Sequence, residues 1–303
     1  MTKKGFTVKA VEPRKKQDNG FDYDKIKARM RGKTVVFCLP GRQFSAEFLK
    51  SFVSLCFEVV QNGMSIQISN DYSSMVNFAR CKVLGANVTK GRWQQPWQGR
   101  LNYDIQMWID SDIQFKPKQF WELCDTAFFD EPLEDSADIN EWPYCQLSND
   151  ELEQLDHSQL DVRREKIRRL NLLGNPIVSG VYLTEDGYTT PVAHWIDDGE
   201  EFIRNGGTMK HENIETIMKR SKPFEASFVG GGWLLIKKGV FENMAYPWFG
   251  PKLQTFENGI TDFCGEDVGF CLDAKELGIR VVVDPRICVS HEKIRALTIN
   301  RNQ

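Results

Sequence analysis

Apolar residues along this chain fall into short unbroken runs, which alternate with longer segments in which apolar positions recur every three or four residues. The first pattern is typical of strands buried in a sheet, and the second is typical of helices that bury one face. Strands that alternate with helices of this length predict a mostly parallel sheet with right-handed crossovers. In the first half of the chain, the expected strands are residues 34–39, 64–69 and 103–112, and the expected helices start after Ser45, Ser73 and Pro117.

The middle of the chain departs from this alternation. Residues 129–170 begin with an acidic segment, and Ser148 and Glu151 then form a plausible capping box for a charged helix. The basic residues 163–169 of that helix favour a solvated helix end over a nucleic-acid surface. Beyond it, residues 176–183 and 189–193 resemble a strand pair around an acidic turn. The last expected elements are a strand at 233–238, a helix at 264–278 and a strand at 279–284.

Composition places the chain among ordinary globular proteins. It has 303 residues, of which 41% are hydrophobic and 27% are charged, and its net charge of -3 gives no global electrostatic case for binding nucleic acid or a membrane surface. The eight cysteines are scattered without zinc-ligand spacing, and the first residues lack the apolar core of a signal peptide. No apolar run is long enough to span a bilayer, so we expect a cytoplasmic protein without a membrane span.

The third expected strand ends in two carboxylates one residue apart, Asp110 and Asp112. In an open α/β sheet, ligands bind beyond the carboxyl ends of the strands, which is where both residues are expected. Mg2+ and Mn2+ are typically held by one or two carboxylates together with phosphate oxygens of the substrate. An isolated Asp-x-Asp is more often a plain turn, so this motif gains weight only from other features of the chain.

Three further features bear on the same kind of site. Residues Gly230 to Gly232 precede an apolar strand, which suits both a close approach of ligand to backbone and a tight turn. Glu266 and Asp267 lie at the start of an expected helix, where they either complement the helix dipole or supply a base for an acceptor hydroxyl. His291 follows a strand, and it is either structural or a third metal ligand.

In this order and spacing, these features resemble the GT-A type glycosyltransferases, in particular the family 2-like group that includes versions carried by large bacteriophages. The resemblance runs from about Lys33 to Lys293. It implies a Rossmann-like α/β fold, with one large domain and a small acceptor-side subregion. The expected parts are an N-terminal arm (1–32), a nucleotide-sugar-binding half (33–127), a helical and acidic insert (128–175), an acceptor-binding and catalytic half (176–295) and a tail (296–303).

The resemblance also implies roles for individual residues. Asp267 is the expected general base, with Glu266 as the alternative. Asp110 is expected to contact the ribose or the metal, and Asp112 and His291 are expected to hold Mn2+ or Mg2+ on the diphosphate of the donor. The chain departs from the commonest pattern at Cys81, where many relatives carry Asn. The residues expected to bind the nucleotide sugar are Pro40, Gly41, Arg42, Asn70, Asp71, Arg80, Asp110, Ser111, Gly231, Gly232 and Trp233.

The implied activity is transfer of a sugar from a nucleotide-diphosphate donor, preferably a UDP-sugar, to an acceptor hydroxyl, with inversion if Asp267 deprotonates the acceptor. Retaining GT-A enzymes use the same metal motif, so the stereochemical outcome stays open. The acceptor is a glycan or, as for some phage transferases, a hydroxylated base of DNA, which Trp93, Trp97 and Arg100 could help to hold. A third possibility is an inactive nucleotide-binding or glycan-binding module. If phage-encoded, the protein is expected in the host cytoplasm.

Overall fold

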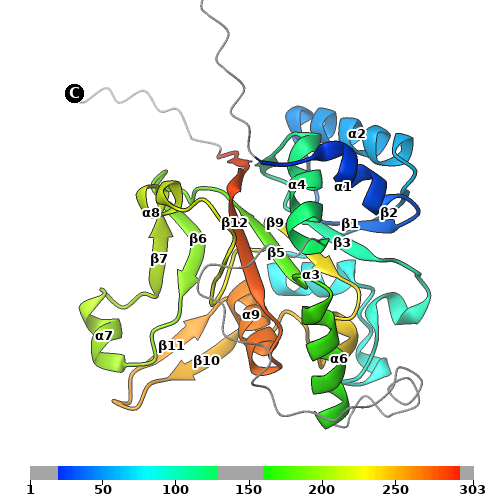
Figure 1. Ribbon diagram of the computed structural model, residues 1–303. Coiled ribbons are helices and arrows are strands. Elements are labelled where there is room, and N and C mark those ends of the chain that lie inside the picture. Colours follow the sequence, from blue (N-terminus) through cyan, green and yellow to red (C-terminus); the bar gives the residue numbers. More distant parts are fainter. Residues whose placement is uncertain (1–19, 129–159, 294–303) are drawn as a thin grey trace, which may run out of the picture.

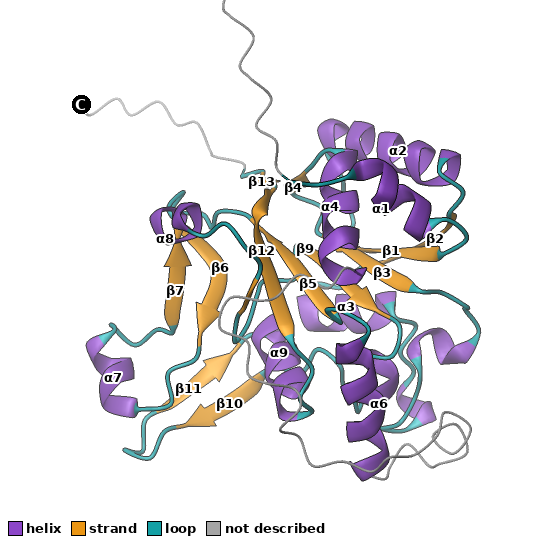
Figure 2. Cartoon of the chain, viewed as in Figure 1, coloured by secondary structure: helices purple, strands orange, loops and turns teal. Residues whose placement is uncertain are grey.

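A seven-stranded sheet forms the centre of the protein in a computed structural model, which describes residues 20–128 and 160–293 (Figure 1; Figure 2). Five of these strands run in one direction, and β9 and β8 run opposite to their neighbours. The expected α/β architecture, a mostly parallel sheet flanked by helices, is therefore confirmed. The order across the sheet is β2 (Ser65–Asp71), β1 (Thr34–Pro40), β3 (Ile105–Ile109), β9 (Trp233–Lys237), β5 (Ile177–Val181), β12 (Val281–Cys288) and β8 (Phe224–Glu225).

The first half of the chain follows the expected alternation of strands and helices. β1 is buried from its second residue onward, because both faces of the sheet are covered, and this explains its unbroken apolar run. The following helix, α2 (Ala46–Gln61), starts where expected, since Ser45 Oγ accepts a hydrogen bond from the Phe48 N–H at 3.1 Å. The other elements of this half are α1 (Tyr23–Met30), α3 (Val76–Val83), η1 (Val88–Lys90), η2 (Pro96–Gly99), β4 (Ile113–Gln114) and α4 (Pro117–Phe128).

Part of the expected N-terminal arm is a packed helix. Ile26 and Met30 of α1 are each only 1% exposed, and they belong to the same core cluster as the residues of α4. The apolar residues at this spacing therefore anchor α1 to the protein. Residues 1–19 and 294–303 lie outside the described residues, so the rest of the arm and the tail stay predictions.

The charged helix expected in the insert is present as α6 (Leu160–Leu172). Within it, Arg168 and Arg169 lie 3.0 and 2.9 Å from the fully buried carboxylate of Glu165. These two arginines therefore pair within their own helix, which accounts for them without a nucleic-acid surface. The capping box expected at Ser148 and Glu151 and the acidic segment lie outside the described residues.

The second half of the chain completes the sheet. β9 lies between β3 and β5, and every one of its residues is buried. α9 (Glu266–Glu276) ends just before Gly278, whose φ of 77° is the left-handed conformation that favours glycine. β12 continues beyond the strand expected at 279–284, because the buried Asp284 is paired with Arg286 at 2.8 Å within the strand. The chain then forms β13 (Ser290–His291), which pairs with β4.

A smaller layer of two-stranded sheets lies beside the main sheet (Figure 2). Here one expectation was wrong, because residues 176–183 and 189–193 do not form a hairpin: β5 pairs within the main sheet and the next strand pairs with β7. Only the turn is formed as expected, with Asp186 accepting hydrogen bonds from the Tyr188 and Thr189 N–H groups. The elements of this half outside the main sheet are β6 (Thr189–His194), α7 (Gly199–Arg204), β7 (Lys210–Asn213), α8 (Ile214–Lys219), η4 (Phe241–Asn243), β10 (Lys252–Thr255) and β11 (Thr261–Cys264).

Hydrophobic residues pack on both faces of the main sheet in two clusters. Every cysteine in the described part of the chain is a free thiol. No helix within residues 20–128 and 160–293 is both long enough and apolar enough to cross a membrane.

Candidate functional site

The ends of three parallel strands form one edge of the candidate site. In the register of β1 and β2, Pro40 lies opposite Asp71, and the Gly41 N–H donates to the Asp71 carbonyl at 3.1 Å. Asp110 follows directly after β3. A Cβ at Gly41 would lie only 3.0 Å from Ser111 Cβ, so glycine allows the end of β1 to pass close to the Asp-x-Asp turn. The structure therefore brings the expected nucleotide-binding segments and this turn together, as the parallel sheet requires.

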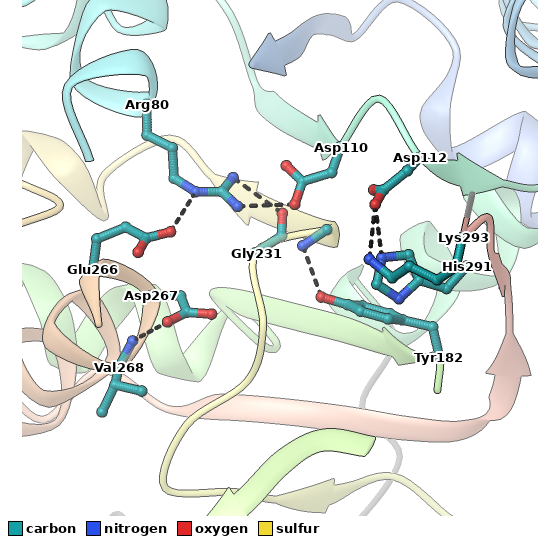
Figure 3. A network of polar contacts seen from close by, with 11 residues as sticks. Arg80, Asp110, Asp112, Tyr182, Gly231, Glu266, Asp267, Val268, His291 and Lys293 are labelled. Atoms are coloured by element: carbon teal, nitrogen blue, oxygen red, sulfur yellow. Dashed lines mark hydrogen bonds and ion pairs between the residues drawn. The ribbon is translucent and has the colours of Figure 1, made fainter. Parts of the chain in front are cut away.

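Arg80 of α3 is the centre of a buried network of polar contacts (Figure 3). Its side chain is 4% exposed, and its Nη2 lies 3.0 Å from Asp110 Oδ2. Its Nε lies 3.3 Å from Glu266 Oε1, and its Nη1 donates to the Gly231 carbonyl at 3.3 Å. One guanidinium thus joins α3, the Asp-x-Asp turn, the glycine segment and the start of α9.

The surroundings of Arg80 keep it charged. Its Cζ lies 5.9 Å from the ring centroid of Trp108 and 5.8 Å from that of Phe249, within the range of cation–π attraction. Burial alone would lower the pKa of the guanidinium, but the nearby carboxylates of Asp110 and Glu266 raise it above its ordinary value. Arg80 is therefore a fixed cation that orients two of the predicted site carboxylates.

The three glycines of residues 230–232 make room for protein side chains. A Cβ at Gly230 would lie 2.3 Å from Tyr182 Oη, and one at Gly231 would lie 2.7 Å from Arg80 Cζ. The Gly232 N–H donates to the Tyr182 hydroxyl at 3.1 Å, and the Gly232 carbonyl accepts from the Asp110 N–H at 3.0 Å. A tight turn packed on Arg80 and Tyr182 therefore accounts for these glycines, and their contact with a ligand stays a prediction.

Two side-chain nitrogen atoms lie close to the Asp112 carboxylate, one from β13 and one from a residue that follows this strand. His291 lies opposite Ile113 in the pairing of β13 with β4. His291 Nε2 lies 3.0 Å from Asp112 Oδ2, and Lys293 Nζ lies 3.1 Å from the same oxygen (Figure 3). The Glu292 N–H also donates to the Asp112 carbonyl, at 2.7 Å, so the backbone holds this strand against the Asp-x-Asp turn.

The other ring nitrogen of His291 fixes its orientation. His291 Nδ1 lies 2.8 Å from the Leu183 carbonyl, which can only accept, so Nδ1 carries a proton. The other ring nitrogen, Nε2, faces Asp112 Oδ2. The ring also packs edge-to-face against Tyr182, with the centroids 5.2 Å apart. An imidazole held by a carbonyl on one side, with its free nitrogen beside a carboxylate, has the arrangement of a metal-ligating histidine.

Asp112 and His291 offer two candidate ligands for a divalent cation. Carboxylate oxygens suit Mn2+ and Mg2+, and imidazole is a common metal ligand, although Lys293 Nζ lies 3.1 Å from the same Asp112 oxygen. Asp110, the third expected ligand, is turned instead towards Arg80. Within the described residues, no group of three or more His, Cys, Asp or Glu side chains is placed to hold a metal ion. In this arrangement a cation would have two protein ligands, Asp112 and His291.

Asp267 lies in the first turn of α9, near the Arg80 end of the network (Figure 3). Its Oδ1 accepts a hydrogen bond from the Val268 N–H at 2.8 Å. Burial and then the negative charge of Glu266 raise the pKa of Asp267 above its ordinary value, although Arg80 opposes this shift. A half-buried carboxylate with a raised pKa beside a cluster of charged groups is a candidate general base.

The expected nucleotide-binding side chains at the ends of β1 and β2 differ in their contacts. Asn70 Nδ2 donates to the Leu39 carbonyl at 2.6 Å and to the Gly41 carbonyl at 3.0 Å, so this amide fixes the end of β1. Arg42 is exposed, and its Cζ lies 5.9 Å from the ring centroid of the exposed Tyr72. Arg42 and Tyr72 therefore leave a charged and an aromatic surface accessible next to the Asp-x-Asp turn.

Two tryptophans are used differently from what the sequence suggested. Trp233 was expected to bind the nucleotide sugar, but its side chain is fully buried, with its ring centroid 4.7 Å from that of Phe115, so this expectation was wrong. It alternates into the core because β9 is covered on both faces. Trp97 Nε1 donates to the Val83 carbonyl at 2.9 Å and to Ser69 Oγ at 3.2 Å, which makes Trp97 a packing residue between α3 and β2.

Two residues of the network were not expected from the sequence. Tyr182 is separated from Gly232 by 50 residues, and no local pattern signals that contact. Lys293 could have been found, because residues two apart in an extended segment lie on the same side, and Lys293 is two residues beyond the expected ligand His291. Both nitrogen atoms lie within 3.1 Å of Asp112 Oδ2.

Comparisons with known proteins add little to this geometry. No protein-family model matches the chain, and a search of curated protein sequences found no significant match. Among solved structures, the chain is similar to A197 from STIV, with 12% identity, a TM-score of 0.36 and coverage of 89% of this chain and 100% of that one. It is also similar to GalNAc-T7, solved with UDP, GalNAc and Mn2+, with 10% identity, a TM-score of 0.38 and coverage of 86% of this chain and 44% of that one.

Proposed function

We propose that this protein is a metal-dependent glycosyltransferase, which moves a sugar from a nucleotide-diphosphate donor, preferably a UDP-sugar, to an acceptor hydroxyl. The proposal is carried by the pair Asp112 and His291, whose Oδ2 and Nε2 lie 3.0 Å apart beyond the end of β3. A carboxylate and an imidazole oriented by a carbonyl, at the carboxyl end of a parallel sheet, are suited to hold Mn2+ or Mg2+ against a diphosphate.

The nucleotide of the donor is proposed to lie across the ends of β1 and β2. Pro40, Gly41 and Arg42 would flank the base, with Asn70 and Asp71 continuing this pocket. Support comes from the register that sets Pro40 opposite Asp71 and from the exposure of Arg42. Asp110, held by Arg80, is proposed to contact the ribose, and Ser111 and the backbone of Gly231 and Gly232 are proposed to line the path to the sugar.

In the proposed reaction, Asp267 accepts the proton of the acceptor hydroxyl while the hydroxyl oxygen bonds to the anomeric carbon. The bond from that carbon to the diphosphate oxygen breaks, so the products are the glycosylated acceptor and a nucleoside diphosphate, with the proton on Asp267. Direct displacement of this kind inverts the anomeric configuration. A divalent cation at Asp112 and His291 would supply positive charge that stabilises the leaving diphosphate. The raised pKa of Asp267 supports its role, since a base is more effective as its pKa approaches the working pH.

A glycan is the proposed acceptor, in preference to a hydroxylated DNA base. The DNA alternative relied on the basic leader, of which residues 1–19 lie outside the described residues, and on Trp93, Trp97 and Arg100 to hold a strand by stacking and charge. Trp97 is committed to hydrogen bonds with Ser69 and Val83, and this removes one of the aromatic residues from that surface.

Calorimetric titration with UDP, with and without Mn2+, tests the proposal on the wild type and two variants. We expect Mn2+-dependent binding that Asp112→Ala abolishes, whereas Asp267→Asn should bind UDP normally and lose turnover, measured as UDP release from a panel of UDP-sugars. Asp24→Ala, an exposed carboxylate on α1, is the control and should change neither. Full activity in both site variants would show that the assignment is wrong. If the wild type does not bind UDP, the same titration would be repeated with GDP.

A further inference from the structure

Lys293 places a positive charge next to Asp112, at a point where a bound divalent cation would be stabilised by negative charge. Its Nζ lies 3.1 Å from Asp112 Oδ2, the oxygen that also faces His291 Nε2 at 3.0 Å. A metal ion held by that oxygen would bring a second positive charge close to the ammonium group of Lys293. Since like charges repel strongly at such short range, Lys293 and a divalent cation cannot both neutralise Asp112 in this geometry.

The two nitrogen atoms at Asp112 differ in how firmly they are held. His291 is 16% exposed in its side chain, and its ring is fixed by the Leu183 carbonyl and by Tyr182. The Lys293 side chain is 39% exposed, and a lysine stem has four rotatable bonds. Lys293 can therefore leave Asp112 without disturbing the backbone of β13, whereas His291 stays in place as a ligand.

The negative group that a displaced Lys293 would meet is the diphosphate that arrives with the cation. Lysine binds phosphate oxygens as a mobile point charge, and such charge-assisted hydrogen bonds are among the stronger polar contacts in proteins. On the basis of the proposed function, we propose that the divalent cation displaces Lys293 from Asp112 and that Lys293 then binds the donor's diphosphate. Lys293 thereby makes metal and donor bind cooperatively, because it opposes the metal alone and supports the metal with the donor.

The test measures two affinities in the wild type, in Lys293→Met and in Lys293→Arg, at one pH. The first is Mn2+ without nucleotide, followed by the loss of the free Mn2+ signal in electron paramagnetic resonance. The second is UDP at saturating Mn2+, followed by calorimetry. Lys50→Met is the matched control, because Lys50 also forms a close ion pair, with Glu47 at 2.7 Å, and both side chains lie on the exposed face of α2.

Lys293→Met should change the two affinities in opposite directions. Mn2+ alone should bind about three- to tenfold more tightly, the scale set by loss of one exposed ion pair. UDP with Mn2+ should bind about tenfold more weakly, because a charge-assisted contact to the diphosphate is lost. Lys293→Arg retains the charge and should stay near the wild type in both measurements, and Lys50→Met should change neither.

Each other outcome overturns the proposal. Unchanged or weaker Mn2+ binding in Lys293→Met, or failure of both proteins to bind Mn2+, would mean that Lys293 does not compete with a cation at Asp112. Unchanged UDP binding would mean that Lys293 does not reach the diphosphate. The proposed sugar transfer fails separately, by the absence of turnover with every UDP-sugar, while the opposite shifts of the two affinities could still be observed.

Discussion

The two ends of the polar network differ in burial and in the number of partners that hold each group. At the Arg80 end, a cation that is 4% exposed contacts two carboxylates and a backbone carbonyl. At the Asp112 end, the carboxylate is 42% exposed and Lys293 is 39% exposed. A buried ion network is costly to break, whereas exposed pairs contribute little and exchange readily. The Arg80 end is therefore suited to hold the site's shape, and the Asp112 end is suited to exchange its partners for ligands.

Breaking the Arg80 end should have the largest effect. Arg80→Met leaves Asp110 and Glu266 without their shared cation inside the protein, and we expect a loss of about 3–5 kcal/mol in the free energy of unfolding. Urea denaturation followed by circular dichroism measures it. Asp112→Ala at the other end should cost no more than about 1 kcal/mol, because its ion pairs are exposed.

Arg42→Met is the matched control, since Arg42 is exposed and should change stability by at most about 0.5 kcal/mol. Equal losses for Arg80→Met and Asp112→Ala would remove the distinction between the two ends.

The glycine segment tests whether the Arg80 end is also closely packed. A Cβ at Gly231 would lie 2.7 Å from Arg80 Cζ, so Gly231→Ala must displace the guanidinium, at a cost of about 1–3 kcal/mol. Gly250→Ala is the control, because its Cβ would meet Pro247 at an ordinary 3.4 Å. Urea denaturation of both variants measures the difference. A Gly231→Ala protein as stable as Gly250→Ala would mean that Arg80 can move freely.

The strands that frame both ends were predictable from the sequence because their burial leaves a local trace. β1, β3 and β9 are buried almost throughout, and each appears in the sequence as an apolar run, interrupted in β3 only by the buried Gln106. The start of α2 was predictable for a similar reason, since Ser45 caps it through an atom three residues away. Short-range patterns therefore carried most of the fold.

Contacts between distant segments left no such trace. The end of β12 was missed because Asp284, Pro285 and Arg286 interrupt the apolar run, although the two charges pair within the strand. The contact of Tyr182 with Gly232 depends on how β5 and β9 are placed in the sheet. For the same reason, the sequence could suggest that Asp110 is a ligand but could not show that Arg80 would bind its carboxylate.

The smallest expected effect is a shift in pH dependence, and it sharpens the comparison by testing how the Arg80 end tunes Asp267. Burial and then Glu266 raise the pKa of Asp267, while Arg80 lowers it. Glu266→Gln removes the negative neighbour and releases Arg80 from one partner, and both changes lower that pKa. Because the base must be ionised, activity falls as the pH falls through the pKa of Asp267, so the acid limb of kcat/KM should move to lower pH in Glu266→Gln. The profile is measured as UDP release from the donor and acceptor that give turnover.

Mn2+ binding measured over the same pH range shows whether the limb belongs to the base. If Asp267 sets the limb, Mn2+ binding persists below it and only the variant's activity profile moves. If Mn2+ binding falls together with activity and Glu266→Gln leaves the limb where it is, Asp267 does not set it. A limb that moves to higher pH in Glu266→Gln would contradict the electrostatic role given to Glu266, since removal of a negative charge cannot raise the pKa of a neighbouring carboxyl group.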